Sequence, residues 1–111
     1  MLPKRVRDME KYRIVVARRV KTQLLNHISF LARVSIPAAK RLRNSYEDIL
    51  VRLKENPFQF PIDPIFAELN LTYRKALFEK RYEVLFTIEG NIVYIDSVID
   101  CRETCAKMCD G

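Results

Sequence analysis

The sequence predicts an α+β fold of two layers, with a helical hairpin packed on one face of an antiparallel sheet. Two patterns predict it. Three short runs between residues 72 and 103 alternate apolar and polar side chains, as half-buried strands do. Two longer stretches between residues 18 and 56 repeat apolar residues every three or four positions, as amphipathic helices do. A chain of 111 residues is expected to form a single domain around one core.

A three-stranded meander is expected in the second half of the chain, with strands at 72–79, 81–88 and 92–99. The Glu-Gly-Asn turn after the second strand is typical of a hairpin. The second strand is expected to turn one apolar stripe to one face: Tyr82, Val84, Phe86 and Ile88. The third strand is apolar on both faces, which predicts a central or doubly covered position. Its two faces are expected to hold Val93, Ile95 and Ile99, and Ile92, Tyr94 and Val98.

One strand and two helices are expected before the meander. The β-branched apolar run at 12–17 is typical of a strand. A first helix is expected at 18–33, and a second begins after Ser35, a suitable N-cap, with Pro37 in its first turn, and runs to about Asn56. Helices joined so closely form an antiparallel hairpin. Their inner stripes are expected to pack on the meander: Leu24, Ile28, Leu42, Tyr46, Ile49 and Leu53.

Residues 56–71 are expected to connect the second helix to the meander. Three prolines argue against a strand here, because proline donates no ladder hydrogen bond. An ordered crossover is therefore expected, with its three phenylalanines closing the end of the core. With consecutive strands paired, the helices cover one sheet face and leave the other partly open.

The charge is unevenly distributed. The chain has a net charge of +6, and residues 1–56 hold 14 Lys and Arg against 5 Asp and Glu. Residues 57–111 hold 6 against 9. A basic half beside an acidic half indicates a polyanion or an acidic protein segment as partner. Solvated helix faces explain the same charges without any partner.

The two ends of the chain differ from the rest. Residues 1–11 are expected to be a loose basic arm, and 104–111 a tail that contains cysteines. The thiols of Cys101, Cys105 and Cys109 are expected to be free, because a metal site normally needs a fourth ligand and His27 is distant in sequence. No metal or cofactor is expected. With neither a secretory signal nor an apolar run of about 20 residues, a cytoplasmic protein without membrane contact is expected.

Three segments carry a resemblance to a known family: YRIVVA before the helices, ENPFQFP after them, and YRKALFEKRYEVLFTIEGNIVYIDSVIDCRE at the end. The last contains a basic strand, a strand with a tyrosine, an acidic-Gly turn and an apolar strand that closes on an arginine. In this order, over residues 12–103, they resemble the RelE/ParE superfamily of bacterial toxins. The resemblance implies the RelE/ParE-like fold and a type II toxin–antitoxin (plasmid stabilisation) system. It also implies a hetero-oligomer with a cognate antitoxin, whose C-terminal segment wraps the toxin.

The resemblance also implies where a site would lie. The family's ribonuclease members cut messenger RNA in the ribosome with Arg and Lys residues on strands and a Tyr or His near the C-terminus. The matching candidates for nucleic-acid or target binding are Arg74, Lys75, Arg81 and Arg102. Arg102 matches the terminal arginine best, and Arg74 matches the basic position of the preceding strand. Arg74 and Arg81 equally suit cross-strand charge pairs with neighbours such as Glu79 or Glu83.

Groups for proton transfer, which RNA cleavage also needs, match the family poorly. Asp100 stands where many members carry histidine, and Glu83 follows Tyr82 where ribonuclease members often carry arginine. The tyrosine that some members carry in the tail is missing after Arg102. His27 lies beside the apolar stripe of the first helix, where a structural role is favoured over a catalytic one.

Three functions are consistent with the sequence. The favoured one is a ParE-like toxin that binds a target such as DNA gyrase and is not an enzyme. The second is a RelE-like, ribosome-dependent endoribonuclease, whose catalytic candidates are Arg74, Arg81, Asp100 and Arg102. The third is a non-toxic nucleic-acid-binding domain that uses its basic helices on phosphates.

Overall fold

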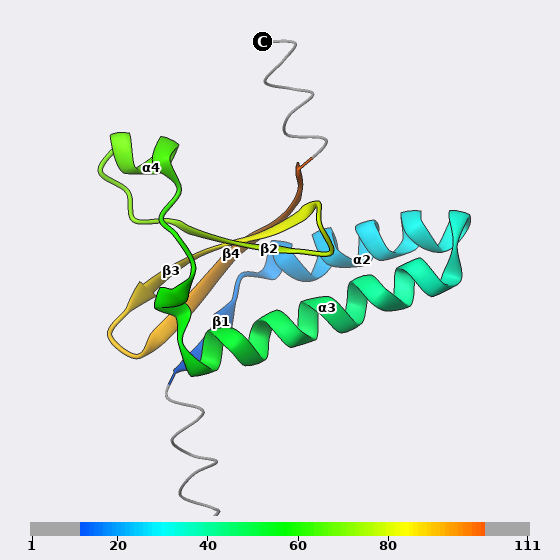
Figure 1. Ribbon diagram of the computed structural model, residues 1–111, viewed down its shortest axis with the longest axis horizontal. Helices are drawn as coiled ribbons and strands as arrows, with labels where there is room; N and C mark the ends of the chain where they lie inside the picture. The colour runs from blue at the N-terminus through cyan, green and yellow to red at the C-terminus, as the bar shows by residue number, and fades with distance from the viewer. Residues whose placement is uncertain (1–11, 102–111) are drawn as a thin grey trace, which may run out of the picture.

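The computed structural model describes residues 12–101 and has the α+β architecture that the sequence predicts (Figure 1). Its elements are β1 (Arg13–Val16), α2 (Arg18–Val34), α3 (Ile36–Glu55), a 3-10 turn (Pro57–Gln59), α4 (Pro64–Glu68), β2 (Arg74–Phe78), β3 (Tyr82–Glu89) and β4 (Ile92–Asp100). The predicted arm at 1–11, the tail at 104–111, Arg102, Cys105 and Cys109 lie outside the described residues.

The sheet is mixed. Strands β2, β3 and β4 form the predicted antiparallel meander, but β1 does not pair with β2 as consecutive pairing requires. It lies parallel to β4, with Arg13 opposite Ile92 and Val16 opposite Ile95, so the strand order is β1-β4-β3-β2. The expected central position of the last strand is confirmed, because β4 has a neighbour on each side. Parallel neighbours need a long connection, and here the helical hairpin, the crossover and two strands lie between β1 and β4.

The two helices form a hairpin that packs on one face of the sheet. Ser35 separates them and caps α3, because its Oγ accepts a hydrogen bond from the N–H of Ala38 at 3.2 Å. Pro37 occupies the first turn of α3, as predicted. The expected inner stripes are confirmed, with two half-buried residues on α2 and four buried ones on α3: Leu24, Ile28, Leu42, Tyr46, Ile49 and Leu53.

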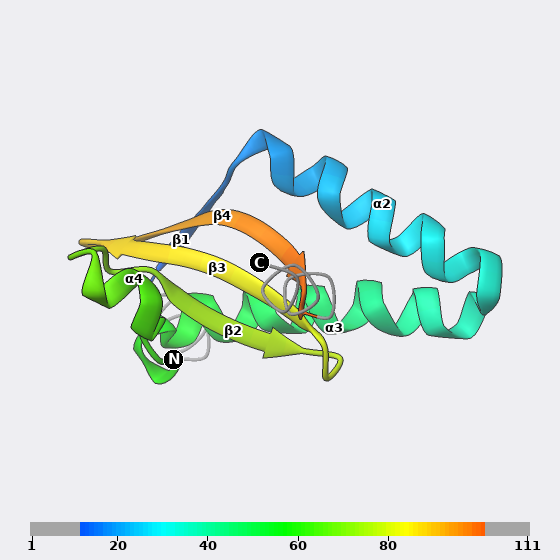
Figure 2. The ribbon, with the colours of Figure 1, turned by 90° about the horizontal axis from the view of Figure 1, so that it is seen from above.

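The far end of the hairpin projects past the sheet (Figures 1 and 2). The turn between β2 and β3 reaches the side of α3 well before that end. Three large apolar side chains near the junction of the helices are strongly exposed, Phe30 by 59%, Val34 by 77% and Ile36 by 61%. The helical part of the core therefore runs from Val20 to Leu31 on α2 and from Leu42 to Leu53 on α3.

A β-bulge changes which residues of β4 face the core. Leu85 lies opposite Ser97 but Phe86 lies opposite Ile95, so Asp96 is an extra residue on β4. One inserted residue reverses the alternation beyond it. Val98, not Ile99, therefore joins Val93 and Ile95 in the core, and the expected faces of Val98 and Ile99 are wrong. The stripe on β3 has no such break and is as predicted.

The crossover between α3 and β2 is ordered but contains more structure than a loop. Asp63 caps α4 through its Oδ1, which accepts from the N–H of Ile65 at 2.8 Å. Ile62 forms an isolated bridge with Arg74 at the edge of β2. Of the three phenylalanines, Phe60 packs against the core, but Phe58 is 53% exposed and does not close it.

The face of the sheet opposite the helices is only partly covered. Register and alternation place three exposed apolar side chains on this open face: Val15, Leu77 and Tyr94. Figure 1 shows α4 beyond the β2 edge, on the side away from α3. None of the helices between residues 12 and 101 has both the length and the apolar character that crossing a bilayer requires.

Candidate functional site

Arg74 is bound to the crossover. Its Nη1 donates a 2.7 Å hydrogen bond to the carbonyl oxygen of Phe60, and its guanidinium lies 5.1 Å from the ring centroid of Phe58. Both contacts hold residues 58–60 against the first residue of β2. The cross-strand charge pair considered from the sequence does not form, since Arg74 lies opposite Phe86.

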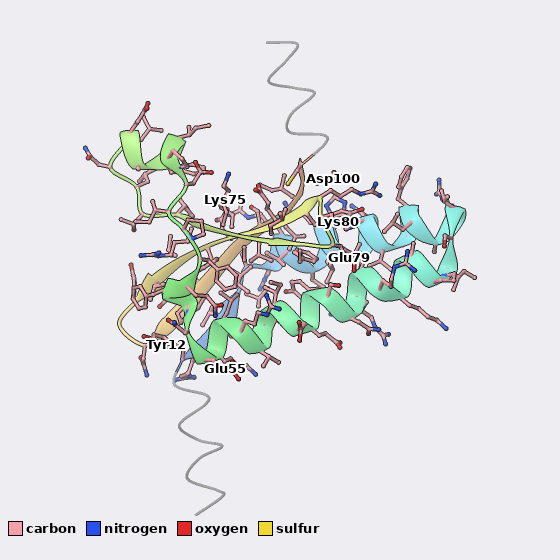
Figure 3. All side chains as sticks on the ribbon, viewed as in Figure 1. Tyr12, Glu55, Lys75, Glu79, Lys80 and Asp100 are labelled. Atoms are coloured by element: carbon pink, nitrogen blue, oxygen red, sulfur yellow. The ribbon has the colours of Figure 1, made fainter. Side chains whose placement is uncertain are left out.

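Lys75, the next residue, lies on the open face. Its Nζ is 3.3 Å from Asp63 Oδ2 and 3.5 Å from Glu83 Oε2, so two carboxylates surround one ammonium group. Figure 3 shows Lys75 on the side of the sheet away from α3. Burial lowers the pKa of Lys75, but the charge of Glu83 and the hydrogen bond and charge of Asp63 outweigh it, so the pKa is raised. Lys75 is thus the charged centre of a local ion cluster.

Arg81 and Asp100 lie together at the other end of the sheet. Asp100 is opposite Tyr82 in the sheet register, and the N–H of Cys101 donates to the carbonyl oxygen of Arg81 at 2.7 Å. The guanidinium of Arg81 lies 5.4 Å from the ring centroid of Tyr82, within the range of a cation–π contact. Arg102, the fourth cationic candidate, lies outside the described residues.

A pocket of about 300 Å³ opens beside Arg81, between the helical hairpin and the turn that joins β2 to β3. We call it the turn pocket. Its walls come from α2, α3, the turn and the start of β3: Leu31, Ala38, Arg41, Leu42, Glu79, Lys80, Arg81 and Tyr82. Figure 3 shows Glu79 and Lys80 at this end of the sheet, near Asp100. Three of the eight lining residues are cations, so the pocket is suited to bind an anion.

The backbone of the turn sets the direction of two lining residues. Glu79 and Lys80 have positive φ angles of 48° and 68°, in the left-handed region that residues other than glycine seldom adopt. Ser45 on α3 fixes one of them, because its Oγ donates a 2.8 Å hydrogen bond to Glu79 Oε1. The turn is thereby fastened to the hairpin, and the two elements together form the pocket.

His27 has a structural contact on α2. Its Nε2 lies 3.3 Å from the carbonyl oxygen of Val98, which can only accept a hydrogen bond, so this nitrogen is the donor. Its ring centroid is 5.3 Å from that of Tyr82. His27 therefore fastens α2 to β4, which agrees with the structural role favoured from the sequence.

The structure brings together only some of the residues that the sequence singled out. Arg81 and Asp100 share one end of the sheet, whereas Arg74 and Lys75 lie toward the other end and on opposite faces. Sequence reasoning missed Arg41 and Lys80, which line the turn pocket. The only feature of the sequence that pointed to Arg41 was the set of basic residues beside the apolar stripe of the second helix. Among residues 12–101, no group of three or more His, Cys, Asp or Glu side chains gathers as metal ligands.

The described residues thus form two charged features, the cationic turn pocket and the ion cluster at Lys75. No protein-family model matches the chain, and no curated protein matches it in sequence.

Proposed function

We propose that this protein is the toxin of a type II toxin–antitoxin pair, with the RelE/ParE arrangement, and that it acts by binding its target rather than by cutting RNA. The order of its elements supports the proposal: an N-terminal strand, a helical hairpin and a three-stranded meander. This order agrees with the resemblance carried by the three sequence segments.

The dispersal of the candidate cations is the observation that favours binding over cleavage. RNA cleavage needs charge stabilisation and proton transfer at one phosphate. Arg74 and Lys75 face opposite sides of β2, and the four residue-to-residue steps from Arg74 to Phe78 span about 13 Å at the usual rise of a strand. Arg81 lies beyond that distance, past the turn. These three cations cannot contact one phosphate without a large rearrangement.

The ion cluster at Lys75 supports the same conclusion. Asp63 and Glu83 both lie within ion-pair distance of its ammonium group. A phosphate approaching Lys75 would meet two carboxylates as well, and like charges repel at short range. The open face near Lys75 is therefore poorly suited to a phosphodiester.

The open face supports a protein partner. Val15, Leu77 and Tyr94 are exposed by 43%, 56% and 36% on a face that the helical hairpin leaves free. Val15 and Tyr94 are direct neighbours in the register of β1 and β4, and adjacent exposed apolar side chains are typical of interaction surfaces. We propose the cognate antitoxin as the protein that covers this face, in a hetero-oligomer with the toxin.

Induction in a bacterial host tests the proposal. We expect growth arrest, relieved when the adjacent reading frame is co-expressed, with a change in plasmid supercoiling that precedes any fall in translation. The two proteins are expected to purify as a complex. Growth unaffected by induction, or a toxin that stays free beside its neighbour, would argue against the proposal.

The ribonuclease alternative has its own test. Purified protein is added to ribosomes programmed with messenger RNA, and new 5′ ends are mapped by primer extension. We expect no discrete cuts in the ribosomal A site. If discrete cuts appear and are lost with Arg102→Ala, the protein acts by cleaving RNA and the binding proposal is wrong.

A further inference from the structure

The turn pocket has two chemically different sides. Leu31, Ala38 and Leu42 give it an apolar wall from the hairpin. Val34 lies one helical turn beyond Leu31 on α2, so the wall continues toward the exposed end of the hairpin. Arg41, Lys80 and Arg81 give it a cationic side. A ligand that satisfies both sides must itself be apolar in one part and anionic in another.

The cations of the pocket are available to a ligand. Among residues 12–101, the side chains of Arg41, Lys80 and Arg81 form no ion pair. The single carboxylate of the lining, Glu79, already accepts the hydrogen bond from Ser45. The pocket thus holds three cations against one carboxylate, and Arg81 is oriented in advance by its contact with the Tyr82 ring.

The apolar wall favours a peptide over a nucleic acid. Leucine and alanine side chains offer no hydrogen bond to a base edge or a sugar. Stacking on an aromatic ring is the usual way to hold an unpaired base, but the Tyr82 side chain is buried, with 2% of the residue exposed. A phosphate would use the cations and leave the wall in contact with water.

We propose that the turn pocket binds a peptide segment of a partner protein in which acidic side chains flank a large apolar side chain. The apolar side chain lies against Leu31, Ala38 and Leu42, and the carboxylates pair with Arg41 and Arg81. This inference rests on the proposed function for the source of the segment, which is the antitoxin.

Titration of the full-length, ¹⁵N-labelled protein tests the pocket without any toxicity assay. The probe is the capped hexapeptide EELFDE, and the comparisons are EESSDE, KKLFKK and hexauridylate. We expect EELFDE alone to give saturable shifts of the Leu31, Ala38 and Arg81 amide signals. Arg41→Gln is expected to weaken binding about tenfold, as loss of a charge-assisted contact does. Lys40→Gln, one residue away and outside the pocket, is the matched control and is expected to leave binding unchanged.

Three results of the titration would overturn the proposal. Equal saturation by EESSDE would show a simple anion site, and equal or tighter binding of hexauridylate would show a nucleic-acid site. Absence of saturable shifts with EELFDE up to about 5 mM, a concentration that detects even weak ligands, would show that no such peptide binds.

Rescue in cells separates this proposal from the proposed function. The variant Arg41→Glu is expected to arrest growth like the wild type but to resist rescue by the adjacent reading frame. The contrary result is a variant that has the melting temperature of the wild type but has lost its toxicity. That result would show that the pocket binds the target rather than the antitoxin, and it would overturn the proposal. A wild-type chain without toxicity would refute the toxin function, and the titration would still decide whether the pocket binds the peptide.

Discussion

Gln23 on α2 accepts a hydrogen bond of 2.9 Å from the backbone N–H of Val98 on β4. One helical turn later, His27 donates to the carbonyl oxygen of the same residue. The register of β1 with β4 ends at Ile95, just before the bulge. Two side chains of α2 therefore take the place of a strand partner where β1 has ended.

Replacing Gln23 by leucine should leave the N–H of Val98 without its partner. A buried donor that loses its hydrogen bond costs about 1–3 kcal/mol, and we expect Gln23→Leu to lower the free energy of unfolding by that amount. Urea denaturation followed by circular dichroism measures it. Thr22→Ala, on the exposed side of the same helix, is the control and should change stability by less than about 0.5 kcal/mol. An equally small effect of Gln23→Leu would show that the hydrogen bond does not stabilise the fold.

The two fully buried leucines of α3 should contribute strongly to stability. Leu42 and Leu53 are both 0% exposed in the core between the helices and the sheet. Leu42→Ala and Leu53→Ala are each expected to lower the free energy of unfolding by about 2–5 kcal/mol, because each removes apolar contacts and opens a cavity. Val51→Ala on the exposed side of α3 is the control. Losses below about 0.5 kcal/mol at both leucines would mean that this face of α3 is not packed against the sheet.

Asp63 combines two roles that substitution can separate. It caps α4 and also pairs with Lys75. Asp63→Ala removes both interactions and should cost at least about 1 kcal/mol. Asp63→Asn retains a good N-cap and loses only the charge, so a smaller loss in urea denaturation is expected. Equal losses would show that the ion pair, and not the cap, accounts for the effect.

Alkaline pH should weaken the ion cluster on the open face. The pKa of Lys75 is higher in the folded protein than in the unfolded chain, so the folded state binds its proton more tightly. The resulting stability is fully present below about pH 10.4, the usual value for lysine, and is lost as the pH rises through the folded pKa. We expect wild-type stability to fall more steeply than that of Lys75→Gln above that pH, when urea midpoints are compared from pH 9 upward. Parallel profiles would contradict the raised pKa.

The sequence was informative where a regular pattern persists. The stripe from Tyr82 to Ile88 and the inner stripes of both helices were predicted because their periods of two and 3.6 continue unbroken. The faces of Val98 and Ile99 were not predicted, because the β-bulge at Asp96 leaves no signal in the local sequence. α4 was missed although Asp63-Pro64 is a typical helix start, since the surrounding prolines were read only as strand breakers.

Long-range relations were the least predictable. Nothing in the first strand indicates that it pairs with the last, and local alternation is the same for parallel and antiparallel neighbours. The turn pocket shows the same limit. Arg81 was a candidate through the family resemblance, and Lys80 precedes it in the same turn, but Arg41 joins them only because the tertiary fold brings α3 against the turn. Charges on a helix face or in a turn are common, so their convergence becomes visible only in three dimensions.

The pairing of β1 with β4 has a consequence for synthesis on the ribosome. Its two strands come from opposite ends of residues 12–101, and β4 is translated after every other element in that range. The nascent chain can form the helical hairpin early, because its contacts are local. The apolar side chains of β1 and of the hairpin then stay exposed to solvent until β4 emerges and the complete sheet can form. Until β4 emerges, the nascent chain is therefore open to chaperones or to a co-translated partner.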